Sequence, residues 1–147
     1  MATAISGATP KHVWLVGILS LLWNAFGAYD YVMTELGDLG YFEMMGLGQA
    51  ELDFFASLPG WAVALWAVGV WGSVAGSILL LLRSRHAATA FLLSLLGALC
   101  SFAYQFSLEK PAALESGAAV VMPIVILILI VAQWYYARRM AAAGVLR

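Results

Sequence analysis

This sequence of 147 residues has a single cysteine and few charged side chains. The lone cysteine, Cys100, excludes an intrachain disulfide and a CxxC redox pair, and we expect it to be an inert thiol packed in a helix bundle. Only 10% of the residues are charged, whereas 64% are hydrophobic and the mean hydropathy is +0.93. Because soluble domains carry about 25% charged residues, this composition indicates a membrane protein.

The residue sets on which most enzymes and cofactor sites depend are also missing. The sequence contains no phosphate-binding glycine loop, no nucleophile–base–acid set and no metal-ligand or calcium-loop spacing. His12 and His86 fall at the boundaries of apolar segments, which disfavours haem ligation inside a bundle. No basic patch supports nucleic-acid binding. The sequence therefore predicts a non-catalytic protein without a cofactor or metal and without a nucleic-acid partner.

Long apolar segments account for the composition. At a rise of 1.5 Å per residue, about 20 residues cross a hydrocarbon core of roughly 30 Å. The sequence therefore predicts one all-α domain, an integral membrane bundle of four transmembrane helices. The predicted spans are 11–31, 58–82, 87–108 and 116–137, with a disordered leader at 1–9 and an outer loop at 31–57.

Two details of this layout have their own signals. Within the outer loop, 49–58 places Leu52 and Phe55 against Glu51 and Asp53, which predicts a short amphipathic helix. The first span has an alternative interpretation as a signal peptide, since the segment Ala25-Phe26-Gly27 resembles a cleavage site. The tryptophans and the asparagine of that span, together with its thin basic region, favour a retained helix.

Basic and acidic residues fall in different predicted loops. The basic residues near the two termini and in the loop between the second and third spans are Lys11, Arg83, Arg85, Arg138, Arg139 and Arg147. Every acidic residue lies in the other two loops, where Lys110 is the only basic residue. Because Lys and Arg in short loops favour the cytoplasmic side, we predict that both termini are cytoplasmic.

Small residues form stripes in the second and third spans. The stripes comprise Gly69, Gly72, Ser73, Gly76 and Ser77 in one span and Ser94, Gly97, Ala98 and Ser101 in the other. Such spacing lets helix backbones approach closely. Because only 83–86 separates the two spans, we expect a tight antiparallel hairpin, and the alternative is homo-oligomerisation through the same glycines.

Polar residues within the first span are the candidates for function, because buried polar groups in a membrane are costly. Asn24 lies near the middle of the span and Asp30 about 10 Å further out, level with Tyr104 and Gln105 if the third span is antiparallel. Asn24 and Asp30 are about 120° apart around the helix, so one regular helix would not point both at one ligand. We expect an interhelical hydrogen bond at Asn24, an interfacial anchor at Asp30 and a contact with a neighbouring helix at Gly27.

The segments 22–31, 66–72 and 79–85 resemble an uncharacterised family of small four-helix inner-membrane proteins of Gram-negative, alphaproteobacterial-type bacteria. The resemblance covers the chain from about Lys11 onward. It implies a four-helix architecture and a location in the bacterial inner (cytoplasmic) membrane. Some of these proteins carry the label of a sugar transporter, and no functional residue carries over.

Two functions from different classes follow. The first is a non-catalytic membrane subunit or accessory protein that acts by helix packing, either as a homo-oligomer or with a membrane-protein partner. The alternative is a small dimeric transporter of a sugar-like or other polar solute that uses Asn24, Asp30, Tyr104 and Gln105. A membrane enzyme is a third possibility, for which the sequence offers no catalytic set.

Overall fold

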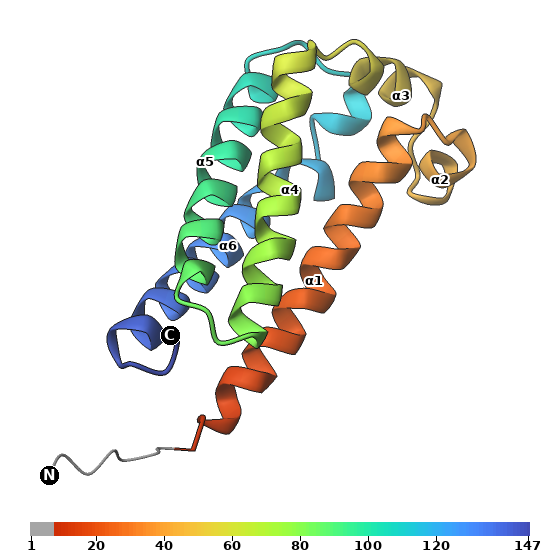
Figure 1. Cartoon of the computed structure of the whole chain (residues 1–147). Coiled ribbons are helices and arrows are strands. Elements are labelled where there is room, and N and C mark those ends of the chain that lie inside the picture. The colour runs from red at the N-terminus through yellow and green to blue at the C-terminus, as the bar shows by residue number, and fades with distance from the viewer. Residues whose placement is uncertain (1–7) are drawn as a thin grey trace, which may run out of the picture.

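The computed structural model describes residues 8–147, which contain helices and no strand (Figure 1). The long helices are α1 (Lys11–Glu35), α4 (Gly60–Leu81), α5 (His86–Phe106) and α6 (Ala118–Ala142). The short ones are α2 (Leu39–Met44), α3 (Gln49–Ala56) and the 3₁₀ turn η1 (Ala112–Leu114). Four helices are long and apolar enough to cross a membrane, which confirms the predicted all-α, multi-pass architecture.

The helices extend beyond two of the predicted spans. Span one was expected to end at residue 31, but α1 continues to Glu35, and α6 continues past residue 137 to Ala142. Each helix ends shortly before a glycine with positive φ, Gly37 (67°) and Gly144 (72°), a backbone state that glycine adopts readily. The predicted leader at 1–9 lies mostly outside the described residues.

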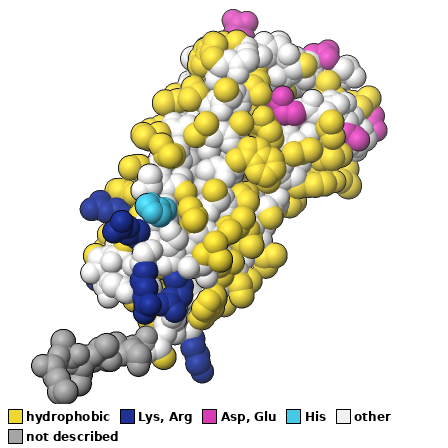
Figure 2. Space-filling view, in the orientation of Figure 1, with side chains coloured by type: hydrophobic (Ala, Val, Ile, Leu, Met, Phe, Trp, Pro, Cys, Tyr) yellow, Lys and Arg dark blue, Asp and Glu magenta, His cyan; other side chains and the backbone are white. Residues whose placement is uncertain are grey.

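The charges separate in space as they do along the chain. Apart from Lys110, Lys and Arg side chains gather at one end of the bundle and Asp and Glu side chains at the other (Figure 2). The start of α1 and the C-terminus both lie at the first end, which we call the basic end (Figure 1). The opposite end, covered by α2 and α3, is the acidic end.

Helices α4 and α5 pack backbone to backbone along the small-residue stripes. A Cβ added to Gly69 would lie 3.0 Å from the Ala98 nitrogen, and one added to Gly97 would lie 2.7 Å from the Leu65 carbonyl oxygen. The buried Ser94 hydroxyl donates a hydrogen bond to the Gly69 carbonyl. The stripes therefore serve the hairpin within the chain. Cys100 is exposed on α5, so the expectation of a packed thiol is wrong.

The chain closes the basic end with its last residues. Leu146 is buried beside Leu80, Ala87 and Phe91. The Arg147 amide donates to the Arg83 carbonyl at 2.7 Å, and the Arg85 amide donates to the Arg147 carbonyl at 2.9 Å. These contacts join the C-terminal residues to the α4–α5 turn.

Side-chain caps shape the two short helices at the acidic end. The Asp38 carboxylate accepts a hydrogen bond from the Tyr41 amide at 2.7 Å at the start of α2. At the start of α3, the buried Glu51 carboxylate accepts one from the Gly48 amide at 2.7 Å. Such caps satisfy backbone donors that have no partner within a helix. Phe42 on α2 meets Phe55 on α3 edge to face, and Phe55 packs on Trp66 of α4 with the two rings tilted, so aromatic contacts link α2 through α3 to α4.

Candidate functional site

Asn24 joins three helices in the middle of the bundle. Its side chain is buried, and its Nδ2 lies 2.8 Å from the Ser77 hydroxyl, 3.2 Å from the Ser73 carbonyl and 3.2 Å from Gln133 Oε1. The first two acceptors belong to α4 and the third to α6. Two amide hydrogens are thus shared among three acceptors. Asn24 therefore ties α1 to both α4 and α6.

A second polar contact joins α1 to α6 at the basic end. His12 Nδ1 and the Tyr136 hydroxyl lie 2.6 Å apart, and the two rings meet edge to face with centroids 5.9 Å apart. Both this contact and the Asn24–Gln133 bond lie in the half of the bundle that runs from its middle to the basic end. Toward the acidic end of the seam between α1 and α6, no hydrogen bond joins the two helices among residues 8–147.

Two adjoining cavities occupy this seam between the Asn24 level and the acidic end. The end cavity, of about 210 Å³, lies beneath α2, α3 and η1, and the middle cavity, of about 190 Å³, reaches down to Asn24. The residues that line both are Asp30, Met45, Trp66, Phe102, Met122 and Ile126. We call the two cavities together the α1–α6 cleft.

Exposed side chains mark where the cleft opens. Trp23 and Phe26 on α1 line the middle cavity, as does Met122 on α6, and their side chains are 36%, 57% and 45% exposed. On the opposite wall, Gly69 and Ala98 belong to the closely packed α4–α5 hairpin. The opening therefore lies between α1 and α6.

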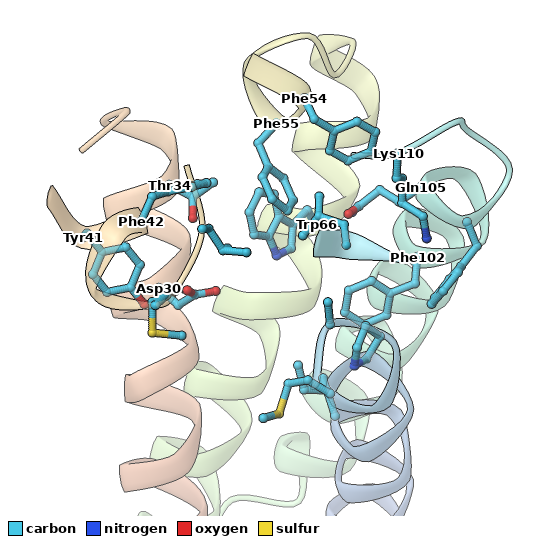
Figure 3. A pocket seen from close by; sticks show the side chains of 18 residues that line it. Asp30, Thr34, Tyr41, Phe42, Phe54, Phe55, Trp66, Phe102, Gln105 and Lys110 are labelled. Atoms are coloured by element: carbon cyan, nitrogen blue, oxygen red, sulfur yellow. Dashed lines mark hydrogen bonds between the residues drawn. The ribbon is translucent and has the colours of Figure 1, made fainter. Parts of the chain in front are cut away.

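Polar groups concentrate in the end cavity. Figure 3 shows Asp30 and Thr34 on the α1 side, Gln105 and Lys110 across the cavity, and Trp66 between them. Lys110 Nζ lies 4.1 Å from the centre of the Phe106 ring, which fixes the ammonium group near this wall. The end cavity therefore has a carboxylate on one wall and an ammonium on the other.

Tyr41 holds the Asp30 carboxylate in place. The Tyr41 hydroxyl donates a hydrogen bond of 2.7 Å to Asp30 Oδ1. Burial, followed by the hydrogen bond to Asp30 and that residue's negative charge, raises the pKa of Tyr41 above its usual value of 10.0. The hydroxyl thus remains a donor at neutral pH. It engages one oxygen of Asp30, and the carboxylate keeps a second acceptor oxygen for a ligand.

The structure brings together only some of the residues predicted to form a site. Asp30 and Gln105 line the end cavity together, while Tyr104 lies outside both cavities and packs on Trp61 with ring centroids 4.5 Å apart. Asn24 and Asp30 both line the middle cavity, although we expected that one helix could not direct both at one ligand. The cavity is long enough for Asn24 to lie at its buried end and Asp30 at its polar end.

Gly27 does not contact a neighbouring helix, so that prediction is wrong. An added Cβ would meet no described atom within 4 Å, because Gly27 faces the cleft. The close approach of α1 occurs at Gly17, where an added Cβ would lie 2.5 Å from Leu81 Cδ2 on α4. The missed signal is the spacing of small and polar residues on the buried face of α1, namely Gly17, Ser20, Asn24 and Ala28.

Gln133 is the other functional position that the sequence analysis overlooked. It is buried on α6 and accepts a hydrogen bond from Asn24. An amide inside the apolar stretch of the last span was the available signal, because such a group needs a partner from another helix.

The remaining titratable residues form no metal site. Among residues 8–147, no group of three or more His, Cys, Asp or Glu side chains lies close enough to hold a metal ion. His86 lies at the start of α5 and His12 pairs with Tyr136, so both belong to the basic end. Comparison of the chain with protein-family models, curated proteins and solved structures finds no match.

Proposed function

We propose that this chain is a non-catalytic accessory protein or subunit of the bacterial inner membrane that acts by packing α6 against another membrane helix. The small-residue stripes and Asn24 are already engaged inside the chain, so they are not the surface for such a partner. Helix α6 is the least buried of the four long helices, since only its residues Ile130, Gln133 and Ala137 are buried, and its outward face is therefore the one left most open to a partner.

The single observation that carries this proposal is a regular apolar stripe on that face. Its exposed residues recur every three and four positions: Val121, Ile124, Ile128, Val131 and Tyr135. This is the spacing with which one helix packs into another at a small crossing angle, and β-branched residues suit that packing. A second copy of the chain or a helix of another membrane protein would pack against this stripe.

Replacing Ile128 by tryptophan should dissociate the complex. A bulky ring in the middle of the stripe would prevent close approach of the partner helix, since association in a membrane depends on van der Waals packing. We expect light scattering in mild detergent to show an oligomer or co-purified complex for the wild type and a loss of most of it for Ile128→Trp.

The matched control is Leu22→Trp on α1. The two side chains are similarly exposed, 65% for Leu22 and 62% for Ile128, and both are apolar. Equal loss of association in both variants would show a general effect of the added ring and would contradict the assignment to α6.

A transporter of a polar solute is the second candidate. The observation that favours it is that Asp30 and Gln105 line one cavity from different helices. Tyr104 does not take part, and the Asn24 amide nitrogen is used by Ser77 and Gln133. Solute uptake into liposomes that Asp30→Asn abolishes would favour transport, whereas absence of uptake for any sugar tested would leave the accessory role.

The charge separation supports an orientation with the basic end in the cytoplasm. In this orientation both termini are cytoplasmic, and α2 and α3 lie on the other face of the membrane. A reporter active only outside the cytoplasm, fused after Arg147, should be inactive, and its activity there would reverse the orientation. The resemblance to small four-helix inner-membrane proteins stays a prediction.

A further inference from the structure

We propose that the α1–α6 cleft binds one phospholipid with a primary ammonium head group. The head group would lie in the end cavity and one acyl chain would enter the middle cavity from the bilayer. This site is separate from the outward face of α6, so it does not depend on the packing role proposed above.

The charges of the end cavity match both ends of such a head group. Asp30 presents a carboxylate from α1, and its remaining oxygen is free to accept a hydrogen bond from an ammonium group. Lys110 lies on the facing wall, where its ammonium would attract a phosphate. Gln105 adds an acceptor, because its Nε2 donates to the Ser101 hydroxyl at 3.1 Å and its carbonyl oxygen is left to accept a hydrogen bond from the head group.

Opposed charges distinguish this head group from simpler ones. An anionic head without an amine would leave the second oxygen of the half-buried Asp30 carboxylate without a donor and close to a phosphate. A cationic ligand without a phosphate would give the Lys110 ammonium no anionic group to attract. A quaternary ammonium carries no N–H to donate, so it would lose the charge-assisted hydrogen bond to Asp30.

The middle cavity suits the acyl chain. Its walls below Asp30 include Phe26, Val70, Phe102 and Ile130, which offer apolar surface continuous with the opening between α1 and α6. Asn24 closes its lower end, about 10 Å below Asp30 along the helix. An acyl chain would enter sideways through the opening between α1 and α6, past Trp23, Phe26 and Met122, whereas a sugar would meet mostly apolar walls.

The test is lipid competition on the intact protein, purified in mild detergent. Equal amounts of phosphatidylethanolamine, phosphatidylcholine and phosphatidylglycerol with identical acyl chains are added, and native mass spectrometry counts the bound lipid. We expect phosphatidylethanolamine to be retained about tenfold over the other two, as the worth of a hydrogen bond to a charged group suggests. Equal retention of all three, or a preference for phosphatidylglycerol, would overturn the proposal using wild-type protein alone.

Asp30→Asn and a control variant then locate the effect. The amide oxygen that Asp30→Asn introduces would still accept the Tyr41 hydrogen bond, so α2 should remain docked while the ammonium loses its charged partner. The preference for phosphatidylethanolamine should fall about tenfold. Glu115→Gln removes an exposed acid from the same end, outside the residues that line the cleft, and should leave the preference unchanged. A preference that survives Asp30→Asn, or that Glu115→Gln removes equally, would contradict binding in the cleft.

Discussion

Gly97→Ala is expected to lower the free energy of unfolding by about 3 kcal/mol, as overpacking of a tight core contact does. The added methyl carbon would lie 2.7 Å from the Leu65 carbonyl oxygen and 2.9 Å from the Gly69 nitrogen. Both atoms belong to the α4 backbone, so no side chain can rotate to make room, and α4 and α5 would have to separate. Thermal unfolding in detergent, followed by circular dichroism, measures the loss.

Gly27→Ala is the matched control for this prediction. Gly27 also lies inside a long helix, but a Cβ there would meet no described atom within 4 Å. The free energy of unfolding of the Gly27→Ala variant should differ from that of the wild type by less than about 1 kcal/mol, and the better helix propensity of alanine favours a small gain. If the two variants were equally stable, the close contact between α4 and α5 would be contradicted.

Asn24→Leu is expected to cost about 2 kcal/mol of stability. Interhelical hydrogen bonds in membranes contribute roughly 0.6 to 2 kcal/mol. The change also leaves the buried Gln133 without its donor, and an unpaired buried polar group costs about 1 to 3 kcal/mol in desolvation. The double variant Asn24→Leu with Gln133→Leu removes both partners. It should be more stable than the sum of the single effects predicts, by about 1 kcal/mol of coupling.

Strict additivity of the two changes would contradict a direct bond between Asn24 and Gln133. Ser20→Leu on the same buried face of α1 serves as a packing control, since no bond joins Ser20 to Gln133. A coupling of similar size between Ser20 and Gln133 would indicate a change in helix position instead of the loss of a hydrogen bond.

The sequence was informative wherever the signal was local. Helix length, the positions of charges and the small-xxx-small spacing at Gly69 and Gly97 predict the four long helices and the α4–α5 hairpin. The antiparallel register also places Gln105 opposite Asp30, as both line the end cavity. These features depend on periodicity within one or two neighbouring segments.

The remaining features depend on how segments distant in sequence pack together. The hydrogen bond that joins α1 to α6 at Asn24 has its acceptor on Gln133, 109 positions away in the chain. In the same way, Gly27 faces a cleft instead of a helix, and Tyr104 packs on Trp61 and not beside Asp30, because of how separate helices are placed. Neither arrangement has a signal in the local sequence, because both Gly27 and Tyr104 would suit either environment.

The mass of the wild-type protein in mild detergent tests the central claim, association through α6, most directly. After the detergent contribution is subtracted, light scattering should give a protein mass above that of one 15.8 kDa chain, from a second copy or a co-purified partner. A single chain with an intact helical spectrum under the same conditions would contradict the accessory role.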